Sequence, residues 1–145
     1  MNVQDILARK SSNTVRSIEP ERSVEEAVAR LVEHNIGSLV VMERGRPVGI
    51  LTERDILRCC ADGLEKSAST PVSEVMTRDL IVGEAGDTVD YVMGIMTRNR
   101  IRHLPIIGPG ERLVGMVSIG DVVESQLRET IYENRHLRQY ISGSY

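Results

Sequence analysis

Two pairs of side chains combine a hydroxyl with a carboxylate three residues later. Thr52 precedes Asp55 and Ser118 precedes Asp121, each time after an apolar run that begins with glycine. Such a pair can cap the start of a helix, because both side chains bind backbone N–H groups of the first turn. An ionised aspartate is also a pure acceptor, which suits the paired 2′- and 3′-hydroxyls of a ribose. The residue types therefore allow both helix capping and sugar binding.

Basic side chains close to these pairs could neutralise a phosphate. Arg102 and His103 are adjacent and lie upstream of the second pair, and Arg54 is next to Asp55. A guanidinium binds phosphate oxygens as a fork, an imidazole can donate a hydrogen bond, and N–H groups at a helix start attract anions. Arg16 is a further candidate. If Arg102 and His103 lie within a strand, their side chains point to opposite faces and cannot both reach one ligand.

The motif occurs twice because the chain repeats itself. With an offset of 65 residues Ile36 matches Ile101, and after one inserted residue near Pro109 an offset of 66 aligns Gly49 with Gly115. A match in register across so much of the chain predicts two copies of one structural unit.

The two copies differ at one chemically important place. The second copy carries Arg102 and His103 where the first has Gly37 and Ser38. Only the second copy therefore has charge at this position, and we predict that the two sites differ in affinity or in ligand.

Each copy predicts the order strand, helix, strand, strand, helix, preceded by a short lead-in helix. Ser23 and Glu26 have capping-box spacing before a helix with one apolar face. The expected fold class is α+β with tandem β-α-β-β-α repeats, and a short strand is expected over Leu80–Val82. The expected division is repeat 1 over 1–64, a linker over 65–71, repeat 2 over 72–125, and a C-terminal helical extension over 126–145.

The C-terminal extension has no counterpart after the first copy. Its apolar side chains fall near one face of a helix, namely Leu127, Ile131, Leu137 and Ile141. Two interpretations stay open: a solvated helix that packs back on the domain, and a helix used for self-association.

Over about residues 1–125 the sequence resembles the cystathionine-β-synthase (CBS) domain, and the whole chain resembles a stand-alone CBS pair. The segments that carry the resemblance are VQDIL and VSEVM, NIGSLVVM with GRPVGILTERDIL, and RIRHLPII with ERLVGMVSIGDVV. The resemblance implies two repeats packed sheet to sheet with pseudo-twofold symmetry, two clefts between them, and association into a homodimer. It also implies that the clefts bind adenosine-containing ligands such as AMP, ADP, ATP, NAD or S-adenosylmethionine.

The resemblance assigns roles to the candidate residues. The ribose is expected at Thr52, Asp55, Ser118 and Asp121, and the phosphate at Arg102 and His103, with Arg54 and Arg16 as further candidates. An apolar slot for adenine is expected at Val15, Gly37, Ser38, Leu80 and Ile81. Gly37 would allow close approach of the backbone to the base.

Composition excludes several classes of function. The chain has 145 residues, a formal net charge of −3, and neither Phe nor Trp, so its core is aliphatic and nothing suggests nucleic-acid binding. No apolar run is long enough to span a membrane, and the N-terminus has no secretory pattern. The adjacent Cys59 and Cys60 form no disulfide framework, which indicates a reducing, cytoplasmic environment.

We expect no catalytic residues, no metal and no catalytic cofactor, because the three histidines are dispersed and no enzyme or metal motif is present. The leading hypothesis is a regulatory module that binds an adenine nucleotide (AMP, ADP, ATP or NAD) and transmits its occupancy to an unknown partner protein. The alternatives are an interaction module without a nucleotide, acting through the C-terminal helix, and a pair that binds S-adenosylmethionine. Cys59 and Cys60 are interpreted as half-buried thiols, with a redox switch as the alternative.

Overall fold

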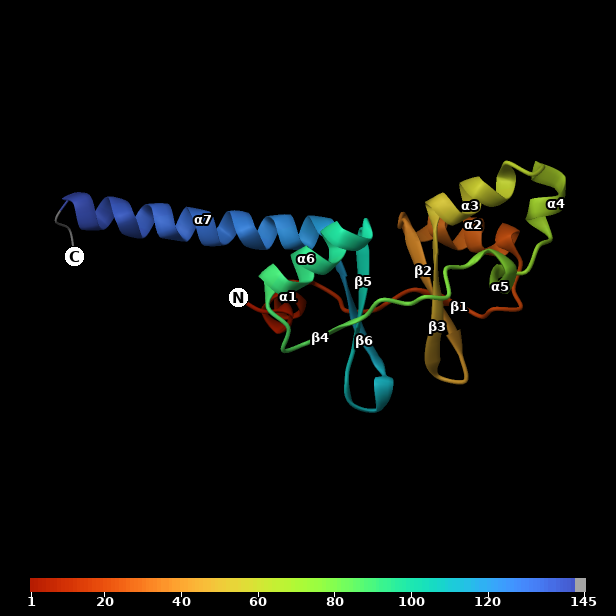
Figure 1. Ribbon diagram of the computed structural model, residues 1–145, viewed down its shortest axis with the longest axis horizontal. Coiled ribbons are helices and arrows are strands. Elements are labelled where there is room, and N and C mark those ends of the chain that lie inside the picture. Colours follow the sequence, from red (N-terminus) through yellow and green to blue (C-terminus); the bar gives the residue numbers. More distant parts are fainter. Residues whose placement is uncertain (143–145) are drawn as a thin grey trace.

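The chain folds into two three-stranded sheets that lie side by side, with helices on their outer faces (Figure 1). The computed structural model describes residues 1–142. The first sheet has the order β1-β2-β3 and the second has the order β4-β5-β6. The strands are β1 (Ser17–Ile18), β2 (Ser38–Glu43), β3 (Arg46–Thr52), β4 (Gly83–Glu84), β5 (His103–Ile107) and β6 (Leu113–Ser118). In each sheet a short parallel strand flanks an antiparallel hairpin, so the predicted α+β class and the tandem repeat are confirmed.

The helices begin where side chains can satisfy their first N–H groups. The side chains of Ser23, Thr52 and Thr88 each accept a hydrogen bond from the backbone of the third helical residue. The helices are α1 (Val3–Arg9), α2 (Val24–His34), α3 (Glu53–Cys60), α4 (Leu64–Ala68), α5 (Val72–Val75), α6 (Val89–Asn99), the short 3-10 helix η1 (Pro109–Glu111) and α7 (Ile119–Ser142).

Three local details differ from the predictions. The capping box at Ser23 is only half formed, because the Glu26 carboxylate lies 3.5 Å from the guanidinium of Arg22. The segment predicted as a linker contains part of α4. The strand predicted over Leu80–Val82 is wrong: the strand is β4, at Gly83–Glu84.

The shift to Gly83 has a steric reason. A Cβ at Gly83 would lie 2.9 Å from Leu104 Cδ2 and 3.0 Å from Ile106 Cδ1. A glycine therefore pairs at this point with β5 without moving the ends of these two large side chains.

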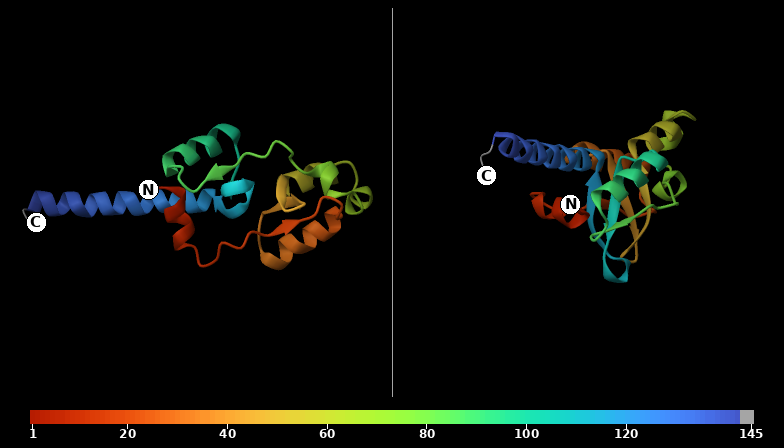
Figure 2. Two further views of the ribbon diagram at one scale, coloured as in Figure 1. Left: turned by 90° about the horizontal axis from the view of Figure 1, so that it is seen from below. Right: turned by 60° about the vertical axis from the view of Figure 1, so that its left-hand side comes forward.

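The two lead-in helices are exchanged between the repeats. Val3, Ile6 and Leu7 of α1 are buried in one core with residues of α6, β5 and β6, which belong to the second repeat. Val72 of α5 is buried in the other core, with residues of α2, β2 and β3 from the first repeat. Figure 2 shows α1 beside α7 and α6, far from β2 and β3. Each apolar core is therefore completed by a segment from the other half of the chain.

A glycine in the last strand of each sheet receives the exchanged helix. A Cβ at Gly49 would lie 2.8 Å from both the Met76 sulfur and the Thr77 carbonyl oxygen. A Cβ at Gly115 would lie 2.8 Å from Leu7 Cδ2. Gly49 thus makes room for Met76, which follows α5. Gly115 makes room for Leu7, which lies near the end of α1.

Helix α7 continues well beyond the second repeat (Figure 1). Its base is anchored by the buried Val122 and Ser125 and by a 3.0 Å hydrogen bond from Gln126 to Asp90 of α6. Over residues 130–139 every side chain is exposed, and Leu137 is 56% exposed. The interpretation that the tail packs back on the domain is therefore wrong for this stretch. The predicted contribution of Ile141 lies outside the residues whose side chains the structure describes.

Candidate functional site

In the first repeat, Thr52 and Asp55 form a complete capping box at the start of α3. The Asp55 N–H donates to Thr52 Oγ1 over 3.3 Å, and the Thr52 N–H donates to Asp55 Oδ2 over 3.0 Å. The Asp55 carboxylate also accepts from the hydroxyl of Thr77, at 3.2 Å from Oδ1 and 3.4 Å from Oδ2. Asp55 is only 7% exposed. Both of its oxygens are therefore bound within the protein, and a sugar hydroxyl would have to displace one of these donors.

In the second repeat, Ser118 and Asp121 form the corresponding pair at the start of α7. The Ser118 N–H donates to Asp121 Oδ2 over 2.9 Å, and the Asp121 N–H donates to Ser118 Oγ over 3.1 Å. Here a cation replaces the hydroxyl of Thr77: Lys10, just after α1, lies 3.0 Å from Asp121 Oδ2. Its ammonium also donates to the carbonyl oxygen of Met116 over 2.7 Å. Among the described residues, no donor binds Asp121 Oδ1.

The environment of Asp121 favours its ionised form. Burial raises the pKa of this carboxyl, but the hydrogen bond from the Ser118 N–H and the ammonium of Lys10 lower it more. The resulting pKa of Asp121 lies below its ordinary value. The group is therefore a charged acceptor with one open oxygen at neutral pH.

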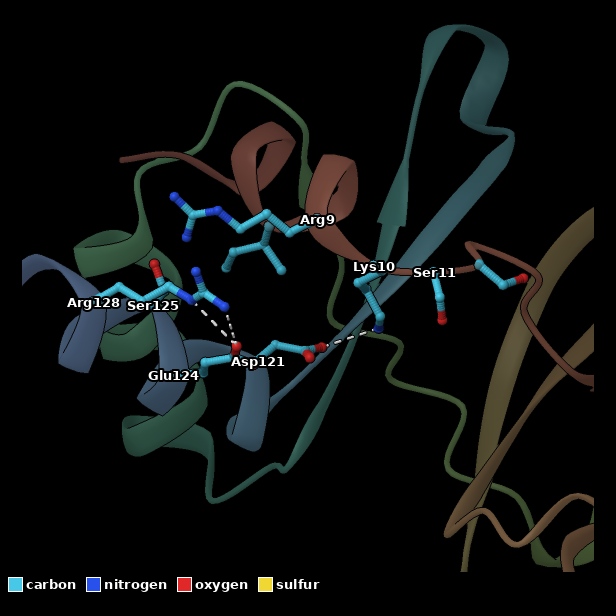
Figure 3. A pocket seen from close by; sticks show the side chains of 9 residues that line it. Arg9, Lys10, Ser11, Asp121, Glu124, Ser125 and Arg128 are labelled. Atoms are coloured by element: carbon cyan, nitrogen blue, oxygen red, sulfur yellow. Dashed lines mark hydrogen bonds and ion pairs between the residues drawn. The ribbon is translucent and has the colours of Figure 1, made fainter.

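A cavity of about 260 Å³ opens beside Asp121, between the C-terminal end of α1 and the base of α7 (Figure 3). Its charged lining consists of Arg9, Lys10, Asp121, Glu124 and Arg128. Glu124 and Arg128 are paired along the helix at 3.0 Å. The cavity thus contains three cations and two carboxylates.

A larger cavity, of about 560 Å³, lies beside Asp55 among α3, α4 and α5. Its charged lining consists of Asp55, Arg58, Asp62, Lys66 and Glu74. This lining has two cations and three carboxylates, whereas the cavity beside Asp121 has three cations and two carboxylates. The pseudosymmetric sites are therefore chemically different.

His103 lies between the two repeats. It pairs with Ser118 across the second sheet, and its Cε1 lies 3.5 Å from where a Cβ of Gly37 would be. Burial lowers the pKa of His103, the carboxylates of Glu53 and Asp121 oppose this, and the net pKa is below the ordinary value. The imidazole is therefore neutral at neutral pH, and its ring lies close to Gly37 of the first repeat.

Arg102 precedes β5, and its carbonyl accepts a 2.8 Å hydrogen bond from the Ile119 N–H. Its side chain is exposed, whereas that of His103 is half-buried. The two residues are thus near Ser118 but differ in surroundings.

The other predicted residues are distributed over both repeats. Arg16 and Arg54 have exposed side chains, and neither lines the two cavities described. Ser38 is buried and pairs with Thr52 across the first sheet. The half-buried residues of the proposed adenine slot are Val15, Gly37, Leu80 and Ile81, of which Ile81 packs against the core of the second repeat.

The sequence reasoning missed four residues that the fold places at these sites. Lys10 and Thr77 each follow a lead-in helix and reach the aspartate of the other repeat. Arg9 and Arg128 line the cavity beside Asp121. The sequence signal was the repeat itself: both missed partners of the aspartates follow the matched lead-in helices.

The thiols of Cys59 and Cys60 are free and half-buried, as the first interpretation expected. Within residues 1–142 no group of three or more His, Cys, Asp or Glu could hold a metal ion. None of the described helices has the length and apolar character needed to cross a membrane.

Comparison with known proteins identifies the family. A model of the CBS domain matches residues 3–62 and 72–128. The CBS domain-containing protein CBSX3, mitochondrial, of Arabidopsis thaliana is 41% identical over 128 residues, 85% of this chain and 62% of that protein. This chain therefore spans less than two thirds of the length of that relative.

Solved structures share most of this arrangement. The CBS-domain containing protein ATU1752 from Agrobacterium tumefaciens has 37% identity and a TM-score of 0.81, over 87% of this chain and 99% of that chain. The CBS domain pair of protein MJ0100, in complex with 5′-methylthioadenosine and S-adenosyl-L-methionine, has 28% identity and a TM-score of 0.77, over 89% and 98%. The family model covers both hydroxyl–aspartate pairs, and the chain therefore belongs to the CBS domain family, with two copies of the domain.

Proposed function

We propose that this chain is a regulatory module that binds an adenosine-containing ligand at Asp121 and transmits its occupancy to a partner protein. The observation that carries the proposal is the open Oδ1 of an ionised Asp121 at the edge of a cavity. A ribose presents two neighbouring hydroxyl donors, and a carboxylate with a free oxygen accepts them well.

The second site is the weaker candidate. Asp55 is buried, and both of its oxygens already accept from Thr52 or Thr77. Binding of a ribose there requires the loss of a hydrogen bond from the Thr77 hydroxyl. We therefore propose that the Asp121 site is occupied first.

The remaining contacts of the ligand follow from the predictions. Adenine is proposed to lie against Val15, Gly37, Ser38, Leu80 and Ile81, and phosphate against Arg102 and His103, with Arg54 and Arg16 as more distant candidates. His103 supports this arrangement because it pairs with Ser118 in the sheet. The MJ0100 complex supports an adenosine ligand, because both molecules named in it contain adenosine.

Occupancy can be transmitted because Lys10 connects the site to α1. A ribose that binds the open Oδ1 of Asp121 shares the carboxylate with the ammonium of Lys10 on Oδ2, and Lys10 directly follows the helix buried in the core of the second repeat. A ligand shifts a conformational equilibrium only if it binds the two states differently. We propose that the position of Lys10 distinguishes those states and that no chemical step is catalysed.

Thermal unfolding with AMP, ADP, ATP, NAD and S-adenosylmethionine tests the proposal. A ligand at 100 times its Kd stabilises a fold by about 2.7 kcal/mol, which is a shift of several degrees for a domain of this size. The shift should be lost in Asp121→Ala and kept in Asp90→Ala, whose carboxylate binds Gln126 on the surface. The proposal fails if no compound shifts the melting temperature, or if Asp121→Ala leaves the shift intact.

A second candidate function is an interaction module that acts through α7. The observation in its favour is the projecting end of α7, where Ile131 and Tyr132 are 58% and 71% exposed. The homodimer expected from the family belongs to this proposal. The two functions are compatible, since α7 begins at the proposed ligand site and ends beyond the domain.

A further inference from the structure

Helix α7 carries a row of side chains on the side that is turned away from the domain. Its base is anchored on the other side, where Val122 and Ser125 are buried. The row continues from this base along the projecting part of the helix (Figure 1). Its members follow each other at intervals of four and three residues and are all exposed, namely Val123, Leu127, Thr130, Asn134 and Leu137.

Intervals of four and three residues form the seven-residue repeat of a coiled coil. With this repeat written abcdefg, Leu127 and Asn134 take a positions, and Val123, Thr130 and Leu137 take d positions. The a and d side chains of such a repeat are buried when a second helix lies along them. The row, which we call the seam, is therefore the surface on which a second helix fits.

The charges beside the seam favour a second copy of the same helix in parallel orientation. Glu133 takes a g position, Arg138 takes the e position five residues later, and both side chains are exposed. In a parallel pair these positions face each other, so Glu133 of each copy meets Arg138 of the other. In the antiparallel pair that aligns the same seam, the carboxylates of the two Glu133 residues meet near the centre and repel each other.

Asn134 provides a second argument for the parallel orientation. A polar residue at a single a position costs stability but fixes the register and the number of helices. In the parallel pair Asn134 meets Asn134, and the two amides can bind each other, since each has both a donor and an acceptor. In the antiparallel pair Asn134 lies opposite Thr130, and this reciprocal match is lost.

We propose that α7 pairs with α7 of a second copy of this chain as a parallel two-stranded coiled coil, in which Asn134 meets Asn134 and Glu133 binds Arg138 in both directions. This inference rests on the interaction function proposed above for α7 and adds the partner, the orientation and the register. The seam from Val123 to Leu137 is about 21 Å long, which is only about two repeats. The dimer should therefore dissociate on dilution.

Disulfide trapping in the full chain tests the orientation. Cys59→Ser and Cys60→Ser remove the natural thiols, and Leu137→Cys introduces one thiol at a d position of the seam. A parallel pair brings the two introduced thiols face to face, so in a glutathione redox buffer a covalent dimer should form at least about tenfold faster than in the control Arg135→Cys. In the antiparallel pair the two thiols would be about 15 Å apart along the helices, and trapping would be as slow as in the control.

Sedimentation equilibrium of charge variants tests the pairing of Glu133 with Arg138. Glu133→Arg places two guanidinium groups together and should weaken the dimer at least about fivefold. Adding Arg138→Glu restores opposite charges and should bring the Kd back to within about threefold of the natural value. The control Glu65→Arg makes the same charge change at an exposed position of α4 and should leave the Kd unchanged. Glu133→Gln should change little, because it removes only an exposed pair.

Asn134→Leu tests the register. A buried leucine stabilises a coiled-coil seam more than a buried amide does, so this variant should tighten the dimer at least about fivefold. The control is Asn99→Leu, at an exposed position of α6, which should leave the Kd unchanged. Circular dichroism confirms that all variants are folded.

The inference is overturned if Leu137→Cys is trapped no faster than its control, if the double charge variant binds as weakly as Glu133→Arg, or if Asn134→Leu does not tighten the dimer. If the natural chain stays monomeric at every concentration, the interaction function proposed for α7 fails together with the inference. A dimer that fails these tests keeps that function and contradicts only the parallel pairing. The binding of adenosine compounds is measured separately by thermal unfolding, so its failure is distinguishable from both.

Discussion

The ammonium of Lys10 lies 3.0 Å from Asp121 Oδ2, so the residue that follows the first helix binds a residue in the first turn of the last one. The contact joins residues 111 positions apart in the sequence and depends on α1 lying in the second repeat. It makes Asp121 at once a helix cap, an ion-pair partner and the proposed acceptor of a ribose.

Replacing Lys10 should change the acid stability of the protein. The pKa of Asp121 is lowered in the folded state, so its contribution to stability is present above the unfolded pKa and is lost as the pH falls through the folded pKa. Lys10→Met removes one cause of the lowering, so the folded pKa of Asp121 should rise, and the acid-induced loss of stability should be smaller and complete at a higher pH. Carboxyl ¹³C NMR titration of Asp121 and acid unfolding measure this. Lys66→Met, which has no such pairing to Asp121, should titrate like the natural chain.

The two motif aspartates should separate into a structural and a binding role. Asp55→Ala leaves the Thr52 N–H and the Thr77 hydroxyl without their buried acceptor, which should cost about 1–3 kcal/mol of unfolding free energy. Asp121→Ala should cost less, because that side chain is more exposed and its partner Lys10 can return to water. Urea unfolding of both variants measures this order, and equal losses would argue against the difference in environment.

Gly49 should tolerate no side chain. Gly49→Ala places a Cβ 2.8 Å from a backbone oxygen, that of Thr77, which is fixed by hydrogen bonds to Ile50 in both directions. The cost should be about 1–3 kcal/mol. Gly115→Ala should cost less, since only the flexible end of Leu7 must move. Gly86→Ala, with no atom within 4 Å of its Cβ, is the control; a loss there equal to that at Gly49 would contradict the steric explanation.

Protonation of His103 should lower the free energy of unfolding when the pH is made mildly acidic. Its folded pKa lies below the ordinary value, so the unfolded chain takes up a proton first as the pH falls. The contribution of His103 is fully present above the unfolded pKa, at about 6.5, and declines from there as the pH falls towards the lower folded pKa. His103→Gln should flatten this part of the profile, measured by urea unfolding. The control variant is His136→Gln, at an exposed histidine on α7.

The projecting part of α7 should contribute to self-association with a second copy of this chain. Ile131→Glu with Leu137→Glu places charges on an exposed face, so the fold itself should be unaffected. The molar mass from light scattering should fall towards that of a monomer. Glu133→Gln, at an exposed polar position of the same helix, is the control and should keep the mass of the natural chain. An unchanged mass in the double variant would remove α7 from the interface.

Much of the fold could be predicted because its determinants are local or repeated. Ser23 and Thr52 cap helices where the sequence indicated. The strand at Leu80–Val82 was wrong because an apolar run signals burial without specifying pairing, and the residues that pair with β5 are Gly83 and Glu84.

The site could be predicted only in part, for a topological reason. The aspartates were evident from their spacing, but their partners Lys10 and Thr77 come from the opposite repeat. Nothing in the spacing of residues reveals that two lead-in helices are exchanged. The cations Arg9 and Arg128 have ordinary neighbours in the sequence, and only the fold brings them to one cavity.

The exchange of α1 also constrains how the protein is made. A chain leaving the ribosome produces α1 first, yet the residues that bury Val3, Ile6 and Leu7 lie between Val89 and Val122. Until those have emerged, the apolar face of α1 has no partner, and non-local contacts of this kind form late. Ribosome-stalled chains that end within residues 65–71 should therefore expose α1 to protease, whereas full-length chains should protect it. Neither repeat can therefore complete its core alone. A chaperone would bind the exposed apolar face of α1 in the interval between the synthesis of the first repeat and that of the second.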